Sequence, residues 1–183
     1  SITLSLISHT NVGKTTLART LLRKDIGVVR DDTHVTDMNA AYIMIETAEG
    51  SVLSLWDTPG FGDSAKLLRH LQNIPKPTGW FLNEALDRLN DRAQWCNQQA
   101  IRNVREDADV VLYLVNAAED PAEAGYVDCE MQILDWLSKP VIVILNQMGP
   151  PRGADIEAGE EKSWEEHLKR FEVVKYVMGL DAF

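Results

Sequence analysis

The stretch Ser8-His-Thr-Asn-Val-Gly-Lys-Thr15 directly follows the apolar run Ile2–Ile7 and precedes leucines at helical spacing. It matches the pattern G-x-x-x-x-G-K-[ST], except that Ser8 replaces the first glycine. A loop between a strand and a helix offers backbone N–H groups and the positive end of the helix dipole, which together replace the water around a polyphosphate. The stretch predicts a loop that binds a nucleoside triphosphate. The alternative is that Gly13-Lys-Thr-Thr16 only begins a helix.

In this loop Lys14 is expected to reach the β and γ phosphates, and the Thr15 hydroxyl is expected to hold a magnesium ion that bridges them. His9 and His34 have no partner that the sequence reveals, so we interpret both as loop residues rather than catalysts. The residues of the loop that we expect to bind the nucleotide are Ser8, His9, Thr10, Asn11, Val12, Gly13, Lys14, Thr15 and Thr16.

A second motif, Asp57-Thr-Pro-Gly60, follows the predicted strand Ser51–Trp56. An aspartate at the carboxyl end of a strand can hold magnesium through a water, and the Gly60 N–H can meet a γ-phosphate. Because proline and glycine both favour turns, the alternative is a simple turn. Together with the first loop, this motif predicts that Lys14 and Asp57 converge on one metal-bound triphosphate.

The stretches H-T-N-V-G-K-T and L-W-D-T-P-G-F-G-D resemble the motifs of Era-like P-loop GTPases, a branch of the translation-factor-related class, and the resemblance runs from Ile2 to Phe183. The chain is also similar to a bacterial group of GTPases with an extra C-terminal domain of unknown function. The resemblance implies an α/β, three-layer P-loop NTPase fold. It implies one GTPase domain over residues 1–183, as a fragment of a longer protein, that hydrolyses GTP with Mg2+ and acts as a conformational switch.

The resemblance also implies roles for residues around the γ-phosphate. Thr36, or else Thr33, would close over magnesium and the γ-phosphate, unless it only caps a local turn. Asn11 would bind a potassium ion beside the phosphates, or else only support the turn of its loop. Phe61 stands where many GTPases have a glutamine that orients water, so hydrolysis is expected to be slow without a partner or K+. The expected catalytic residues are Lys14, Thr36, Gly60 and Asn11, and the expected magnesium ligands are Thr15, Thr36 and Asp57.

The base-binding motif N-K-x-D of such GTPases is replaced here by Asn146-Gln-Met-Gly149. Losing the aspartate removes about 1–3 kcal/mol of preference for guanine. Asn146 either contacts the base or supports the phosphate loop, and Ala182 lies where the family offers a backbone N–H to the guanine oxygen. GTP is the favoured nucleotide, with ATP, another purine or broad specificity as alternatives. The rival function is a nucleotide-dependent scaffold that does not hydrolyse its ligand.

The remaining pattern is that of strands alternating with helices, which favours a mostly parallel sheet with helices on both faces. Tyr126–Leu137 has helical spacing, and Ser163-Trp-Glu-Glu166 is interpreted as a capping box that opens another helix. The strands that we predict besides those at 2–7 and 51–56 span residues 41–46, 110–115, 141–145 and 173–178, with 41–46 paired to 51–56 through a turn at Glu49-Gly50.

Residues 64–107 form a longer connection than a crossover between strands requires. We predict a helical insertion, with one helix over 63–71 and a second over 80–105. It is either an extra core helix or a docking surface for the missing domain, a second subunit or a membrane edge. The large apolar side chains of Trp80, Phe81 and Trp95 would supply the binding energy of such a surface, and the sequence leaves both interpretations open.

Composition limits the class of protein. A chain of 183 residues with 45% hydrophobic content can bury one core, and no apolar run approaches the roughly 20 residues that span a bilayer. The formal charge of −10 disfavours a broad nucleic-acid surface. Cys96 and Cys129 lack metal-ligand spacing, so we expect reduced thiols in the cytoplasm. Peripheral association with a membrane through the missing domain stays open.

Overall fold

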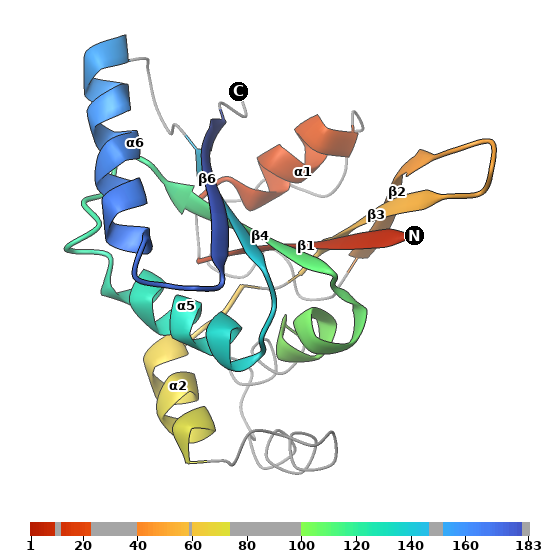
Figure 1. The fold of residues 1–183 in the computed structure, drawn as a ribbon, viewed down its shortest axis with the longest axis horizontal. Coiled ribbons are helices and arrows are strands. Elements are labelled where there is room, and N and C mark those ends of the chain that lie inside the picture. The colour runs from red at the N-terminus through yellow and green to blue at the C-terminus, as the bar shows by residue number, and fades with distance from the viewer. Residues whose placement is uncertain (10–11, 23–39, 59, 74–99, 147–151, 181–183) are drawn as a thin grey trace.

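A computed structural model describes residues 1–9, 12–22, 40–58, 60–73, 100–146 and 152–180. These residues form a six-stranded sheet in the order β2-β3-β1-β4-β5-β6 (Figure 1). Only β2 runs antiparallel, against β3, and the other neighbours are parallel. The strands are β1 (Ile2–Ser8), β2 (Ala40–Glu46), β3 (Val52–Asp57), β4 (Val110–Asn116), β5 (Val141–Asn146) and β6 (Val174–Leu180).

Helices cover both faces of this sheet, which confirms the predicted three-layer α/β fold (Figure 1). α1 (Lys14–Leu22) packs on one face. α2 (Ser64–Gln72), α5 (Gly125–Trp136) and α6 (Ala154–Leu168) pack on the other. Residues 100–102 are helical and lead into a short π-helical turn, η1 (Asn103–Asp107).

The alternation of side chains along a strand divides the core into two layers. In β4, Val111, Tyr113 and Val115 face the layer that contains α2, α5 and α6. Leu112 and Leu114 face the layer that contains α1. Because both faces are buried, the central strands are apolar at nearly every position, as the sequence predicts for a parallel sheet.

The observed elements agree with most of the predicted ones. β2 and β3 pair as a hairpin, and Gly50 at their turn has a φ of +79°. The helix predicted over 126–137 is α5, which ends before Pro140, and the helix predicted over 63–71 is α2. The Asp63 side chain accepts a hydrogen bond from the Lys66 N–H and so caps α2.

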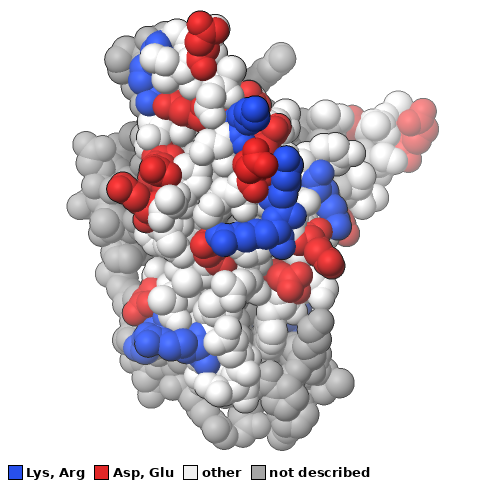
Figure 2. Space-filling model, turned by 60° about the vertical axis from the view of Figure 1, so that its left-hand side comes forward, with Lys and Arg blue, Asp and Glu red and all other residues white. Residues whose placement is uncertain are grey.

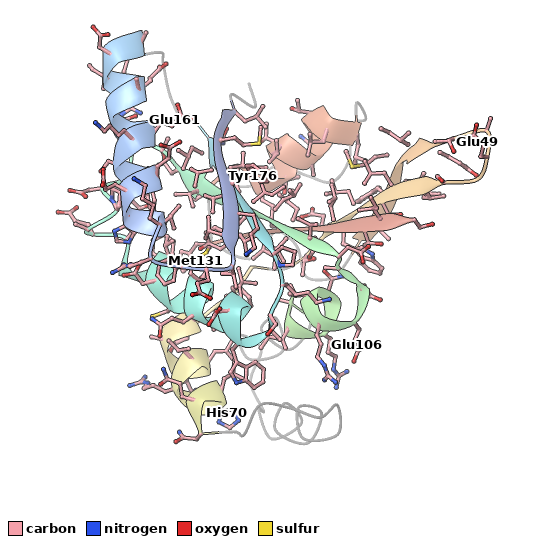
Figure 3. All side chains as sticks on the ribbon, in the orientation of Figure 1. Glu49, His70, Glu106, Met131, Glu161 and Tyr176 are labelled. Carbon is pink, nitrogen blue, oxygen red and sulfur yellow. The ribbon has the colours of Figure 1, made fainter. Side chains whose placement is uncertain are left out.

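The predicted capping box at Ser163–Glu166 is wrong. Ser163 lies inside α6, which begins at Ala154 after Gly153. The residues from Ala154 to Lys162 are mostly strong helix formers, and Asp155 and Glu157 in the first turn complement the positive end of the helix dipole. Glu161, further along α6, accepts a hydrogen bond from the Gly179 N–H of β6 at 3.2 Å, and the two elements lie side by side (Figure 3).

The second helix predicted for the insertion falls largely on residues 74–99, which lie outside the described residues, as do Trp80, Phe81, Trp95 and Cys96. The division into one domain with an insertion over 64–107 therefore stays a prediction. Among the residues described, no helix is both long and apolar enough to cross a bilayer. Cys129 is a half-buried free thiol.

The core layer under α6 depends on Trp164, which is fully buried and donates a hydrogen bond from Nε1 to the Ala117 carbonyl at 3.3 Å. Trp164→Ala is expected to lower the free energy of unfolding by about 3–5 kcal/mol, because it removes packing and leaves a cavity. Ile156→Ala is the matched control, since Ile156 lies on the same helix but is 56% exposed; it is expected to change that free energy by less than about 0.5 kcal/mol. Urea denaturation measures both, and equal losses would contradict this account of the core.

Candidate functional site

The carboxyl ends of β1 and β3 lie side by side, because Leu6 pairs with Asp57 in the parallel register. The loop after β1 leads into α1, whose first residue is Lys14. The Lys14 ammonium donates a hydrogen bond to the Asp57 carboxylate, and the two side chains are only 11% and 8% exposed. The two motifs thus meet at one point on the sheet edge.

This ion pair lies in a largely dry environment. Burial lowers the pKa of Lys14, and the charge and hydrogen bond of Asp57 oppose that shift without cancelling it. The Lys14 ammonium at this point can bind an anionic ligand, and the Asp57 carboxylate beside it can hold a metal cation.

Asn146 closes the loop from the side of β5. It is fully buried, and its Nδ2 donates a hydrogen bond to the Val12 carbonyl at 3.2 Å. A Cβ added to Gly13 would lie 2.8 Å from the same nitrogen, and Gly13 has a φ of +84°. The loop therefore requires glycine at position 13 both for its backbone conformation and for the approach of Asn146. The sequence left two roles open for Asn146, contact with the base and support of the phosphate loop. The hydrogen bond to Val12 supports the second.

The segment after β3 is fixed equally closely to the loop. A Cβ at Gly60 would lie 2.1 Å from the Ser8 carbonyl oxygen, so only glycine fits there. The Thr58 N–H donates to the Leu6 carbonyl at 3.3 Å. Phe61 is fully buried in the core with Leu67 and Leu71, so its ring packs away from solvent.

The other predicted site residues divide between those that the structure describes and those that it does not. Thr15 and Thr16 lie in the first turn of α1 and are half-buried, while Val12 and Ser8 are buried. The predicted site residues outside the described part are Thr10, Asn11, Thr33, Thr36 and Ala182.

Sequence reasoning missed the partner of His9. His9 Nδ1 lies 3.0 Å from Oε1 of Glu130, a fully buried residue of α5, and the His9 ring stacks on Tyr126. The hydrogen bond to Glu130 raises the pKa of His9 above its ordinary value, against the opposing effect of burial. A signal was present in the sequence, since Glu130 interrupts the apolar face of a predicted helix and a buried acid needs a partner.

A second buried polar group was also missed. The Thr58 hydroxyl lies 2.9 Å from the Ser5 hydroxyl and donates to Asn103 Oδ1 at 2.8 Å. Ser5 also hydrogen-bonds to Asn103. The group joins β1 and the second motif to η1, at the end of the connection in which the insertion was predicted. Ser5, a polar residue in an apolar strand, was the signal.

The site offers oxygen ligands rather than a complete metal cage. Within the described ranges, no group of three or more His, Cys, Asp or Glu side chains could hold a metal ion. Magnesium characteristically takes one or two protein oxygens and completes its shell with waters and substrate phosphates. The Thr15 hydroxyl and the Asp57 carboxylate fit that chemistry.

Known proteins identify the fold and the family. The family model of the 50S ribosome-binding GTPase matches residues 3–147. No curated protein matches the sequence. Among solved structures, Era in complex with MgGDPNP and nucleotides 1506–1542 of 16S ribosomal RNA is similar to this chain, with 19% identity and a TM-score of 0.70 over 98% of this chain and 50% of that one.

Two further structures have the same fold. A variant of Era from Aquifex aeolicus bound to GDP.AlF4- has 19% identity and a TM-score of 0.71 over 98% of this chain and 50% of its own. A probable GTP-binding protein, engB, has 18% identity and a TM-score of 0.58 over 98% of this chain and 89% of its own. The chain thus spans about half the length of the Era structures.

The family match covers more than half of the chain, and it includes both motifs that meet at Lys14 and Asp57. The chain therefore belongs to the 50S ribosome-binding GTPase family, and its domain has the P-loop GTPase fold of the Era structures.

Proposed function

We propose that this domain hydrolyses GTP to GDP and phosphate with Mg2+ and acts as a conformational switch. The observation that supports the proposal best is the buried pair of Lys14 and Asp57, because it brings a phosphate-binding cation and a carboxylate that can hold magnesium to one point. Their convergence follows from two motifs that lie far apart in the sequence, so a helix start and a turn occurring by chance do not explain it.

In this proposal Lys14 and the backbone N–H groups of its loop bind and orient the β and γ phosphates. Thr15, Thr36 and Asp57 hold the magnesium ion, which when bound neutralises charge that develops on the phosphates. The Gly60 N–H contacts the γ-phosphate. A Cβ at Gly60 would lie 2.1 Å from the Ser8 carbonyl oxygen, so the segment after Asp57 is packed against the phosphate loop, and a change at the γ-phosphate would move it.

The attacking water needs a group that Phe61 does not supply, because that ring is fully buried in the core. We propose slow hydrolysis that a potassium ion on Asn11 accelerates by adding positive charge beside the phosphates, as an arginine finger does. Loss of the γ-phosphate would release Thr36 and the segment after Asp57, and these are the switching parts.

A scaffold that binds a purine nucleotide with relaxed specificity and does not hydrolyse it is the second candidate. Two observations favour it. Phe61 is buried, and the Asn146 Nδ2 is engaged by the Val12 carbonyl. Phosphate release from GTP with magnesium and potassium distinguishes the two, because only the GTPase produces phosphate.

Partners of the whole protein belong to the proposal too. We propose a C-terminal domain beyond this chain, and a protein partner or a dimer contact through residues 64–107. We propose a cytoplasmic protein, in which only that further domain would contact a membrane. A related structure, Era, is in complex with ribosomal RNA. On the face that Figure 2 presents, basic side chains alternate with acidic ones, which does not favour a broad RNA surface on this domain.

Calorimetry against GTP, GDP, ATP and XTP with magnesium tests the function most directly. We expect GTP and GDP to bind more tightly than ATP and XTP. Lys14→Ala is expected to weaken GTP binding about 10- to 150-fold, because charged hydrogen bonds to phosphate contribute about 1.5–3 kcal/mol. The exposed Lys175→Ala is the control and is expected to bind as the wild type does. Wild-type affinity in Lys14→Ala would count against the whole proposal.

A comparison of Gly13→Ala with Gly50→Ala separates two effects of the substitution: the loss of glycine's backbone freedom and a clash with Asn146. Gly13 and Gly50 have φ values of +84° and +79°, but only a Cβ at Gly13 meets a neighbour, Asn146. Both alanine variants are expected to lose about 1–2 kcal/mol of unfolding free energy through backbone strain. Gly13→Ala should lose more, since Asn146 must move, and it should also weaken GDP binding. Equal losses in denaturation, with unchanged GDP affinity in both variants, would show that Asn146 does not shape the loop.

Potassium dependence is measured as phosphate release at matched ionic strength in KCl and in NaCl. We expect turnover at least about 10-fold faster in potassium, because added positive charge stabilises the transition state. Asn11→Ala should remove that difference while retaining GDP binding. A wild type equally fast in both salts, together with an unchanged Asn11→Ala variant, would refute the potassium site.

A further inference from the structure

Glu130 is a fully buried acid that no step of the proposed reaction uses. Its Oε1 lies 3.0 Å from His9 Nδ1, and its Oε2 accepts a hydrogen bond from the Tyr113 hydroxyl. A buried carboxylate is costly without partners, and His9 and Tyr113 supply it with two.

The partners of Glu130 come from different parts of the fold. His9 follows β1 at the start of the phosphate loop, and Tyr113 lies on β4. α2 packs against α5, which carries Glu130, on the same face of the sheet (Figure 1). A single carboxylate therefore joins the start of the phosphate loop to β4 and to α5, the helix against which α2 packs.

His9 is held on two sides. Its ring stacks on Tyr126, with centroids 4.1 Å apart and planes 25° apart, while its Nδ1 meets Glu130. The Tyr126 hydroxyl in turn donates to Glu119 at 2.6 Å. A ring fixed both by its face and by a nitrogen has little freedom, so the backbone at residue 9 is fixed with it.

We propose that Glu130 is a positioning residue for the nucleotide site: through His9 it fixes where the phosphate loop leaves β1, and through Tyr113 it ties that point to β4. The inference rests on the proposed nucleotide site. Glu130 acts on the nucleotide through its partners, without touching the ligand.

The pKa of His9 is a readout that would not change if Glu130 only helped to pack the core. The groups that face His9 and Glu130 are Glu119, Tyr113 and Tyr126. The Glu130 hydrogen bond is the main cause that raises the pKa of His9, and burial, which lowers it, is the main opposing effect. A glutamine at position 130 keeps the volume but removes the charge, so the pKa of His9 should fall.

The test compares Glu130→Gln with Leu134→Ala in the whole chain described here. Leu134 is fully buried one turn further along α5 and belongs to the core, so its truncation destabilises the helix but removes none of the hydrogen-bonding groups around Glu130. Calorimetry gives the GDP dissociation constant, thermal unfolding gives stability, and NMR titration of the imidazole gives the pKa of His9. Glu130→Gln is expected to weaken GDP binding about 2- to 30-fold, the range for positions that couple to a site without contacting its ligand.

The pH dependence of GDP affinity is a further test, because its direction can be predicted. Anionic phosphates favour a protonated His9, so wild-type affinity should fall as the pH rises through the pKa of His9. In Glu130→Gln this fall should move to lower pH, together with the NMR midpoint. Leu134→Ala should lose stability but retain the wild-type pH profile and GDP affinity.

The outcomes separate two failures. A wild type that binds no purine nucleotide overturns the proposed function, and this inference with it. The positioning role alone is overturned if the wild type binds GDP and Glu130→Gln binds GDP within about 2-fold as tightly, with an unchanged pKa of His9. If Glu130→Gln does not fold, Tyr113→Phe decides, since it removes one donor at nearly constant volume: weakened GDP binding supports the role, and unchanged binding overturns it.

Discussion

The structure depends on an ion pair that stability alone does not require. Lys14 and Asp57 are both about nine-tenths buried, and burial lowers the pKa of the lysine even with the carboxylate beside it. Buried pairs of this kind often stabilise a protein no better than apolar groups of the same size, whereas removing one partner is costly. The pair therefore makes sense as a fixed arrangement of charge. It forces the end of β3, the loop after β1 and the start of α1 to meet.

Two glycines make that meeting possible. At Gly60 the backbone after β3 comes so close to the Ser8 carbonyl that no side chain fits, and at Gly13 the loop leaves room for Asn146. Asn146 belongs to β5, which lies beyond β4, and Gly60 follows β3, so the loop is held from both sides of β1. The site is thus built by the order of the strands, since β1 lies between β3 and β4 and all three end at the same edge.

The sequence predicts the fold well because its signals are local. Continuous apolar runs identify β4 and β5, and the two motifs identify the phosphate loop and its aspartate. It predicts the start of α6 poorly, because Ser163 has the residue type of a cap while Ala154 and its neighbours favour a helix by propensity alone. The partners of His9 and Thr58 are missed for another reason. Glu130 and Asn103 lie far from them in the chain, and only the packing of α5 and η1 on the sheet brings them close.

The buried polar groups are distributed unevenly around the site, so its parts are held by different kinds of contact. The core layer beneath α1 is apolar, with Leu17, Leu55 and Leu114 among its members. The opposite layer contains the cluster around Glu130 and the hydrogen bonds of Thr58 with Asn103. A buried hydrogen bond that is lost leaves its polar groups unsatisfied, at a cost of about 1–3 kcal/mol. Specific hydrogen bonds therefore tie the phosphate loop to α5 through His9, and the segment after β3 to η1 through Thr58, whereas α1 is held to the sheet by apolar packing.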